Sequence, residues 1–314
     1  VIAITPALIQ HALEITGPIY MPEYQETVTS QNLVDLIHYH QLGPGSEGNS
    51  SQLTSDGRTS LRKRFTEVLS QHFMEQMRHL SSARLGKFVE LLFSSLESKD
   101  IQVYFNPPAA ENLLRHLHIA STIEAPAGDS LFVVDANTAG NKANAFIQTQ
   151  MHDQITLDQN GNVQHHLTLS YTWDLPGEIY GTGFYRSYVR IYVPPRSVLK
   201  KSQGWEAFGS SAAFGRTVWS GTYRMHYGET VTLDLLWSVP HVATHVAGNT
   251  WQYSYLLQRQ AGTFWHTNVQ ISLVSCKLKS LPLRDQHIDQ AQRAIWSDLL
   301  KRDITLGANY ACTG

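Results

Sequence analysis

The first 122 residues carry apolar positions at helical spacing, broken by short extended runs. Thr5 and Pro6 form an N-cap followed by proline at the first helical position, and Gly17 with Pro18 ends the helix that they begin. Amphipathic spacing predicts further helices near residues 33–37, 61–73, 81–96 and after Pro107, with short strands at 1–4, 19–21 and 101–105. This order predicts an α/β portion over residues 1–122.

Beyond this point the apolar residues alternate with polar ones in short runs between Gly, Asn, Asp and Pro, which is typical of strands. Residues 154–173 predict a hairpin with a two-residue turn at Asn160 and Gly161. We interpret 294–300 and 304–310 as a last hairpin, with a helix as the alternative for 288–299. The predicted fold is therefore α+β with two domains, the second being an antiparallel, immunoglobulin-like β-sandwich over 123–314.

Charge and hydropathy exclude two classes of partner. The 314 residues have a net charge of −2, so bulk electrostatics would not hold a nucleic acid. No apolar run approaches the roughly 20 residues that cross a bilayer, so we expect no membrane insertion within this chain. The chain starts at Val1 without a Met, from which we expect a fragment of a longer protein.

Cys276 and Cys312 are the two cysteines of the chain. They are either two buried thiols or one disulfide near the C-terminal end, and sequence alone cannot place their Cα atoms within bonding range.

The stretch DSLFVVDANTAGNKANAFI, residues 129–147, places polar residues directly after an apolar run. Asp135 and Asn137 favour Asx-turns, and Asn141 tolerates the left-handed region, so the stretch is explained as a turn that joins two strands. The alternative is a polar ligand loop in which Asp135, Asn137, Asn141 and Lys142 recognise a sugar hydroxyl or an anion.

A second candidate is basic. His38 and His40 end one predicted helix, while Arg58 and Arg62 lie at the start of the next. These side chains could gather an anion such as a pyrophosphate, or they could form a solvated charged face. No set of residues typical of catalysis, of metal binding or of a cofactor site is present in the sequence, so none of the three is expected.

Five blocks carry a resemblance that spans nearly the whole chain: VIAITPALIQHALEITGPIYMPEYQETVTSQNLVDLI, LESKDIQVYF, DSLFVVDANTAGNKANAF, YVRIYVPP and YLLQRQAGT. Together they resemble the bacterial domain of unknown function 4012 (DUF4012) family. This resemblance implies a surface protein anchored by an upstream transmembrane helix, and it implies no established activity.

The α/β portion also resembles the second half of the LytR-CpsA-Psr domain, whose members transfer glycopolymers from a lipid pyrophosphate to the cell wall. The position of that family's Arg-x-Arg pair reads His38-Tyr39-His40 here, and its second cationic cluster reads Asp56-Gly57-Arg58 with Arg62. Part of the cationic set is thus retained, and imidazole is a poor substitute for guanidinium. The resemblance implies that the catalytic arginine and the metal-binding aspartates lie upstream.

These observations predict an extracytoplasmic, cell-surface module with a non-enzymatic binding or structural role. Its expected partner is a cell-wall glycan or another envelope protein. The alternative is a divergent glycopolymer phosphotransferase that acts on lipid-pyrophosphate-linked glycans.

Overall fold

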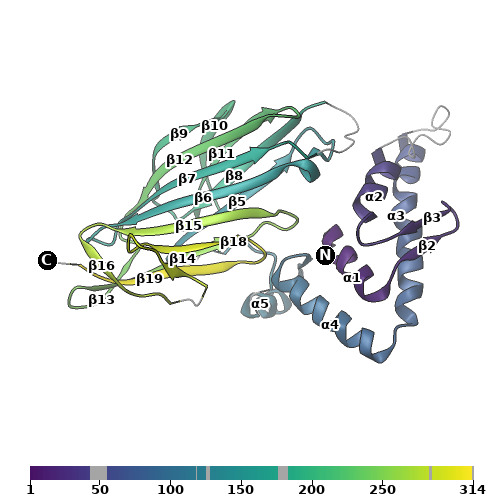
Figure 1. Ribbon diagram of the computed structural model, residues 1–314, viewed down its shortest axis with the longest axis horizontal. Helices are drawn as coiled ribbons and strands as arrows, with labels where there is room; N and C mark the ends of the chain where they lie inside the picture. The colour runs from purple at the N-terminus through teal and green to yellow at the C-terminus, as the bar shows by residue number, and fades with distance from the viewer. Residues whose placement is uncertain (43–54, 118, 125–127, 176–182, 283–284, 313–314) are drawn as a thin grey trace. The chain divides into compact units, whose positions relative to one another are not determined.

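The computed structural model describes residues 1–42, 55–117, 119–124, 128–175, 183–282 and 285–312, with only the backbone described at 42 and 55–62. The chain divides into two compact units, Val1–Thr122 and Ile123–Gly314. The first unit is mainly helical and the second consists of two large β-sheets (Figure 1). The architecture is therefore mixed, with a helical part followed by a β-rich part, as the sequence predicts at this coarse level.

The helical unit pairs its helices with two small antiparallel sheets, β1–β4 and β2–β3. Its elements in chain order are β1 (Ile2–Ile4), α1 (Pro6–Thr16), β2 (Ile19–Met21), β3 (Glu26–Val28), α2 (Leu33–Leu42), α3 (Ser55–Arg78), α4 (Ser82–Glu97), β4 (Ile101–Val103) and α5 (Pro108–His116). The core is formed by the buried side chains of Leu13, Ile19, Met21, Val28, Leu33, Phe65 and Leu69. Apolar residues at helical spacing thus bury one side of α1, α2 and α3.

Helix α1 begins and ends where the sequence predicts. Pro6 is its first residue, and Gly17 ends it with φ +95°, a conformation that glycine adopts without strain. Thr5 does not cap the helix with its side chain, because its hydroxyl donates to Asp100 Oδ1 at 2.8 Å. The predicted cap residue therefore ties the start of α1 to the residue before β4.

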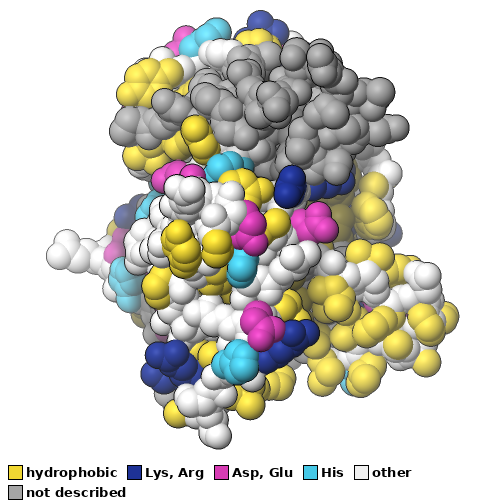
Figure 2. All heavy atoms as spheres, turned by 90° about the vertical axis from the view of Figure 1, so that its right-hand side faces the viewer, with side chains coloured by type: hydrophobic (Ala, Val, Ile, Leu, Met, Phe, Trp, Pro, Cys, Tyr) yellow, Lys and Arg dark blue, Asp and Glu magenta, His cyan; other side chains and the backbone are white. Residues whose placement is uncertain are grey.

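The helical unit also leaves apolar side chains exposed. On α4, Leu85, Val89 and Phe93 follow one another at four-residue intervals and are 51%, 43% and 66% exposed. Figure 2, which faces the right-hand side of Figure 1, shows hydrophobic side chains gathered at the lower right of that face. Among the described residues, no helix is both long enough and apolar enough to span a bilayer.

The second unit is a sandwich whose two sheets enclose one hydrophobic core (Figure 1). The eight-stranded sheet contains β10 (Ala207–Ala213), β11 (Arg216–Met225), β8 (Tyr185–Val193), β5 (Asp129–Asn137), β14 (Thr250–Gln258), β19 (Ile304–Cys312) and β16 (Cys276–Ser280) in spatial order, with β13 (Thr244–Ala247) paired to β14. The seven-stranded sheet has the order β17 (His287–Ile288), β18 (Ala294–Leu299), β15 (Trp265–Leu273), β6 (Gln148–Leu157), β7 (Val163–Thr172), β12 (Thr230–Val239) and β9 (Val198–Gln203).

The prediction of a purely antiparallel, immunoglobulin-like sandwich is wrong in two respects. Each sheet contains a parallel pair, β14 with β5 and β15 with β6. Each sheet alone also has about as many strands as an entire immunoglobulin domain. Alternation along a strand identifies its buried face but not the direction of its neighbour, so periodicity could not reveal these pairs.

The hairpin β6–β7 forms as predicted, but its turn is longer. Leu157 pairs with Val163, which leaves five residues between the strands instead of two. The Asp158 side chain accepts from the backbone N–H groups of Asn160 and Asn162, and only Gly161 in this loop has positive φ. An aspartate that bonds its own loop therefore replaces the expected two-residue turn.

The last two strands do not form the predicted hairpin. β18 pairs with β15 in the seven-stranded sheet, whereas β19 pairs with β14 and β16 in the eight-stranded sheet. The segment between them thus crosses from one layer to the other. Cys276 and Cys312 face each other across β16 and β19 and form a disulfide, which decides between the two alternatives left open by the sequence.

Candidate functional site

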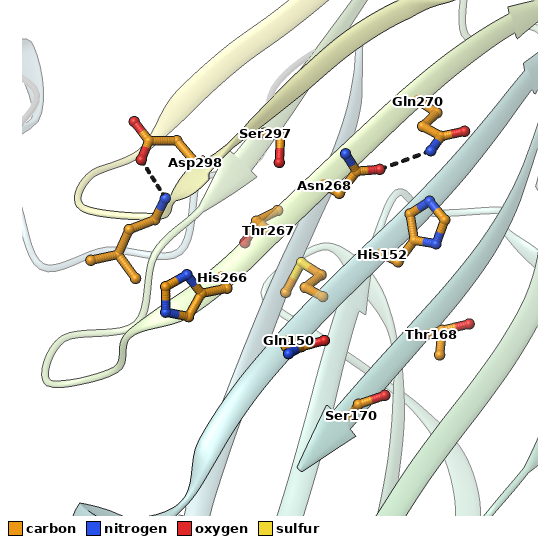
Figure 3. A pocket seen from close by; sticks show the side chains of 12 residues that line it. Gln150, His152, Thr168, Ser170, His266, Thr267, Asn268, Gln270, Ser297 and Asp298 are labelled. Atoms are coloured by element: carbon orange, nitrogen blue, oxygen red, sulfur yellow. Dashed lines mark hydrogen bonds between the residues drawn. The ribbon is translucent and has the colours of Figure 1, made fainter. Parts of the chain in front are cut away.

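The outer face of the seven-stranded sheet carries a trough with a volume of about 600 Å³ (Figure 3). Four adjacent strands, β18, β15, β6 and β7, supply its lining. Side chains alternate along each strand, so Gln150 and His152 face the trough while Asp153 faces the core. The trough is thus lined by the polar half of the alternating pattern.

Strand register aligns the lining residues in two rows that run across the strands at about 4.8 Å intervals. The first row consists of Ser297, Asn268, His152 and Thr168. The second row consists of Leu299, His266, Gln150 and Ser170. Most of these positions offer a neutral hydrogen-bonding group, so the trough presents a ladder of donors and acceptors.

Some of these groups are already oriented by internal bonds. Gln270 Nε2 donates to Asn268 Oδ1 at 2.9 Å, and Thr168 Oγ1 donates to Asp234 Oδ1 at 2.8 Å (Figure 3 shows the first). His152 Nε2 is buried and has no hydrogen-bond partner within the part of the chain that the structure describes. A buried ring nitrogen without a partner is costly, and only a turn of the ring would bring His152 Nε2 to a ligand in the trough.

The same outer face continues into two smaller hollows toward β9. One measures about 390 Å³ and includes Asn162, Gln164 and Lys200. The other measures about 230 Å³ and includes His166 and Lys201. Polar hollows therefore occur from β18 to β9, so an elongated ligand could contact several strands.

The inner face of this sheet holds a charged network that sequence reasoning missed. His165 Nε2 lies 2.7 Å from Asp129 Oδ2, and its Nδ1 lies 3.0 Å from Asp153 Oδ2. All three side chains are fully buried. Both ring nitrogens face carboxylate oxygens, which favours a proton on each nitrogen and therefore the imidazolium form.

Two tyrosines complete this network. Tyr253 OH donates to Asp129 at 2.6 Å, and Tyr255 OH donates to Asp153 at 2.7 Å. The His165 ring also stacks on Trp237 with a centroid distance of 4.4 Å. Burial by itself lowers the pKa of His165, but the charges of Asp153 and Asp129 outweigh it and raise that pKa to about 10.

The network bridges the two sheets, because Asp129 and the tyrosines belong to the eight-stranded sheet while Asp153 and His165 belong to the other. No solvent reaches it, so it cannot touch a substrate and we assign it a structural role. The sequence contained a signal for this buried network. Asp129, Asp153 and His165 each lie at a position of their strand that alternation assigns to the buried face. His165, for example, lies two residues from Val163 and two from Leu167, which are both buried.

The stretch at residues 129–147 is held by internal bonds. Tyr171 OH donates to Asp135 Oδ1 at 2.8 Å, and burial raises the pKa of this half-buried carboxyl to about 7. Asn137 Oδ1 accepts from the N–H groups of residues 139 and 140, which is the predicted Asx-turn. Asn141 is buried and its Nδ2 donates to the carbonyl of Phe184 at 2.8 Å.

Lys142, rather than Asn141, adopts the left-handed conformation, with φ +55°. Burial lowers the pKa of its half-buried ammonium group. Asp135 is bonded by Tyr171, and Asn137 Nδ2 bonds Asn141 at 3.2 Å. The stretch thus connects strands, and a ligand role for these four residues stays a prediction.

The basic cluster is only partly described. His40 is buried, bonds Glu26 Oε2 at 2.9 Å and stacks on Phe65, so its ring belongs to the core of the helical unit. His38 lies half-buried on α2. The side chains of Arg58 and Arg62 lie outside the described residues. An anion site there stays a prediction, and His40 already has an acidic partner.

No protein-family model and no curated protein matches the chain. Solved structures show slight likeness. A protein named as nutrient-binding from Legionella pneumophila has a TM-score of 0.37 and 10% identity, over 59% of this chain and 72% of that chain. The M1 zinc metallopeptidase of Deinococcus radiodurans has a TM-score of 0.29 and 10% identity, over 52% of this chain and 42% of its own.

The folded domain of LppM from Mycobacterium tuberculosis has a TM-score of 0.26 and 10% identity, over 53% of this chain and 91% of that domain. None of these likenesses is close enough to carry an argument about function.

Proposed function

We propose that this chain is a non-enzymatic binding module of the bacterial cell envelope, and that its sandwich unit binds a neutral, hydroxyl-rich ligand such as a glycan. The observation that carries the proposal is the ladder of neutral donors and acceptors across the trough. Hydroxyl groups both donate and accept, so amide, hydroxyl and imidazole side chains complement them without a charge on either partner.

The electrostatics of the trough favour a neutral ligand over a charged one. Asp298 is the carboxylate among its lining residues, and its Oδ1 already accepts from the backbone N–H of Leu299 at 2.6 Å. An anionic ligand would find no Lys or Arg among the lining side chains. Specificity would come from paired hydrogen bonds, since leaving a buried polar group unpaired is costly.

The envelope location is supported by the disulfide between Cys276 and Cys312. Disulfides persist in oxidising compartments outside the cytoplasm. The resemblance to the unknown-function family points to the same place and to an upstream anchor. Both remain parts of the proposal.

The transferase alternative needs His38 or His40 beside Arg58 and Arg62. His40 instead bonds Glu26 inside the helical core, so no described contact favours transfer over binding.

Calorimetric titration of the whole chain with soluble neutral oligosaccharides, including oligomers of N-acetylglucosamine, tests this function. We expect saturable binding that Gln150→Ala with Asn268→Ala weakens by about tenfold, equivalent to about 1.4 kcal/mol of lost hydrogen bonding. The matched control is Gln252→Ala, which changes an exposed glutamine on β14 of the other sheet and should leave affinity unchanged. Absence of binding across the panel, or equal loss in the control, would contradict the proposal.

A further inference from the structure

The strands that end the two sheets, β9, β10, β16 and β17, differ in how they are protected against pairing with another chain, and the four-residue β13 pairs with β14 alone. An unprotected edge strand offers unpaired N–H and C=O groups, and proteins block such edges with lysines, bulges or short strands. β9 carries Lys200 and Lys201 and a register shift against β12. β16 carries Lys277 and Lys279 and a register shift against β19. β17 contains only two residues.

β10 has none of these protections. Its sequence is Ala-Phe-Gly-Ser-Ser-Ala-Ala, without a charge or a proline. It pairs with β11 over all seven residues, Ala207 to Ala213, without a register shift. Within the described residues β10 is the end of its sheet, and five of its seven residues are exposed. A regular, neutral and exposed edge is a template for one more strand.

We propose that β10 is a self-association edge, at which two copies of this chain pair β10 with β10 in antiparallel orientation. The sequence of the strand is complementary to itself about a two-fold axis at Ser210. Such an axis places Phe208 opposite Ala212 of the partner subunit and Gly209 opposite Ser211 of the partner subunit. The one large side chain thus meets a small one, and no two charges face each other.

Charged side chains close to β10 restrict the pairing between two copies of the chain to β10. Glu206, just before β10, has its carboxylate within 3.7 Å of Arg186 and 3.8 Å of Arg224. β9 ends the other sheet at the same edge of the sandwich (Figure 1), where its two lysines would repel those of a second copy. Pairing therefore joins the eight-stranded sheets and leaves the seven-stranded sheets separate.

The dimer geometry keeps the trough accessible. A two-fold axis that relates antiparallel strands of one continuous sheet is perpendicular to that sheet, so both copies present the same face on the same side. The trough lies on the outer face of the other sheet, and two troughs would open in one direction. This consequence, which rests on the proposed function, is bivalent binding to a repeating glycan. The dimer itself does not depend on it.

Sedimentation velocity of the whole chain over a concentration series, without ligand, measures the self-association. We expect a concentration-dependent dimer in the parent protein and a dissociation constant raised at least about tenfold by Ser210→Lys, because the two ammonium groups would lie opposite each other. Val198→Lys is the control, since it adds the same charge to an exposed position on β9. The thermal midpoint of each variant checks that it is folded.

Cross-linking supplies the second measurement. Ser210→Cys should form a disulfide-linked dimer on mild oxidation, because identical residues face each other at the axis, whereas Val198→Cys should not. A parent chain that stays monomeric at every concentration overturns the proposal. So does a Ser210→Lys variant that dimerises like the parent, or equal cross-linking of the two cysteine variants. Because no glycan is present, failure of the dimer leaves the test of trough binding unaffected.

Discussion

The inner and outer faces of the seven-stranded sheet use the same kinds of polar side chain for opposite purposes. His165 and His166 are consecutive on β7, yet His165 is sealed between two aspartates while His166 is exposed and lies 3.4 Å from Asp234. The inner polar groups have partners on both sheets and no solvent. The outer groups form a trough that is open to a ligand.

The difference teaches that burial decides what a polar residue does in this protein. Between the sheets, every oxygen of Asp129 and Asp153 accepts a bond, so the network holds the two layers in one relative arrangement. A buried charge left unpaired would destabilise the fold by several kcal/mol, whereas an exposed polar residue contributes little. The four predictions below test this contrast, from the largest expected effect to the smallest.

Replacing His165 with Ala should have the largest effect. The change leaves two carboxylates buried without their cation, which costs about 3–5 kcal/mol of the free energy of unfolding. All seven tryptophans lie in the sandwich unit, so urea unfolding followed by tryptophan fluorescence reports on that unit alone. The control, His166→Ala, should stay within about 0.5 kcal/mol of the parent.

The same network should respond to alkaline pH. The folded-state pKa of His165, about 10, is above its ordinary value of 6.5, so its contribution is complete below 6.5 and is lost as the pH rises through 10. The His165→Ala variant should lack this decline. Equal losses of unfolding free energy in His165→Ala and His166→Ala would show that the inner and outer faces do not differ as described.

Tyr255→Phe is a milder test of the inner face. It removes the hydroxyl that donates to Asp153 but keeps the ring, so the carboxylate loses one bond and no large cavity forms. A hydrogen bond to a charged group contributes about 1.5–3 kcal/mol. The same urea experiment should show a loss in this range, and Tyr227→Phe, at an exposed tyrosine, should show none. An unchanged free energy of unfolding in Tyr255→Phe would contradict a stabilising hydrogen bond from Tyr255 to Asp153.

Asp135→Asn should have the smallest effect, and its sign depends on pH. The pKa of Asp135 is about 7 in the folded protein and 3.8 ordinarily, so the folded protein retains a proton that the unfolded chain loses. The contribution of this carboxyl to stability should therefore be complete below about pH 4 and decrease as the pH rises to about 7. Asn resembles the protonated acid, and its Oδ1 can still accept from Tyr171.

At pH 8 we expect the free energy of unfolding of the Asp135→Asn variant to exceed that of the parent by on the order of 1 kcal/mol, or roughly 2–4 °C in Tm. The expected gain is this small because Asp135 retains solvent contact, which weakens the effect of burial. Thermal unfolding at pH 4 and pH 8 measures it. A parent whose Tm does not change between these values would contradict the raised pKa.

Local signals in the sequence identified much of the fold. Pro6 and Gly17 bound the first helix because their backbone preferences are intrinsic. Alternation identified β6 and β7 because one face of each is buried. β10 escaped notice because its small residues do not alternate in polarity.

The candidate site was harder to predict. The lining residues of the trough look like ordinary solvent-facing positions on separate strands, and only strand register brings Asn268 beside His152. The stretch at 129–147 attracted attention because its polar residues are adjacent in sequence, but its asparagines bond within the stretch and to the carbonyl of Phe184. Adjacency in sequence marked a turn, whereas the trough gathers residues that lie more than 100 positions apart.

By itself, the sequence determined most element types, the buried phase of the alternating strands and the two-part organisation, because these depend on interactions over a few residues. Tertiary structure alone decided that β18 and β19 separate into different sheets, that two strand pairs are parallel and that Cys276 meets Cys312. It also decided that a histidine in a buried phase carries a charge, because one of its two carboxylates, Asp129, comes from the other sheet. Such pairings are settled by the packing of whole sheets.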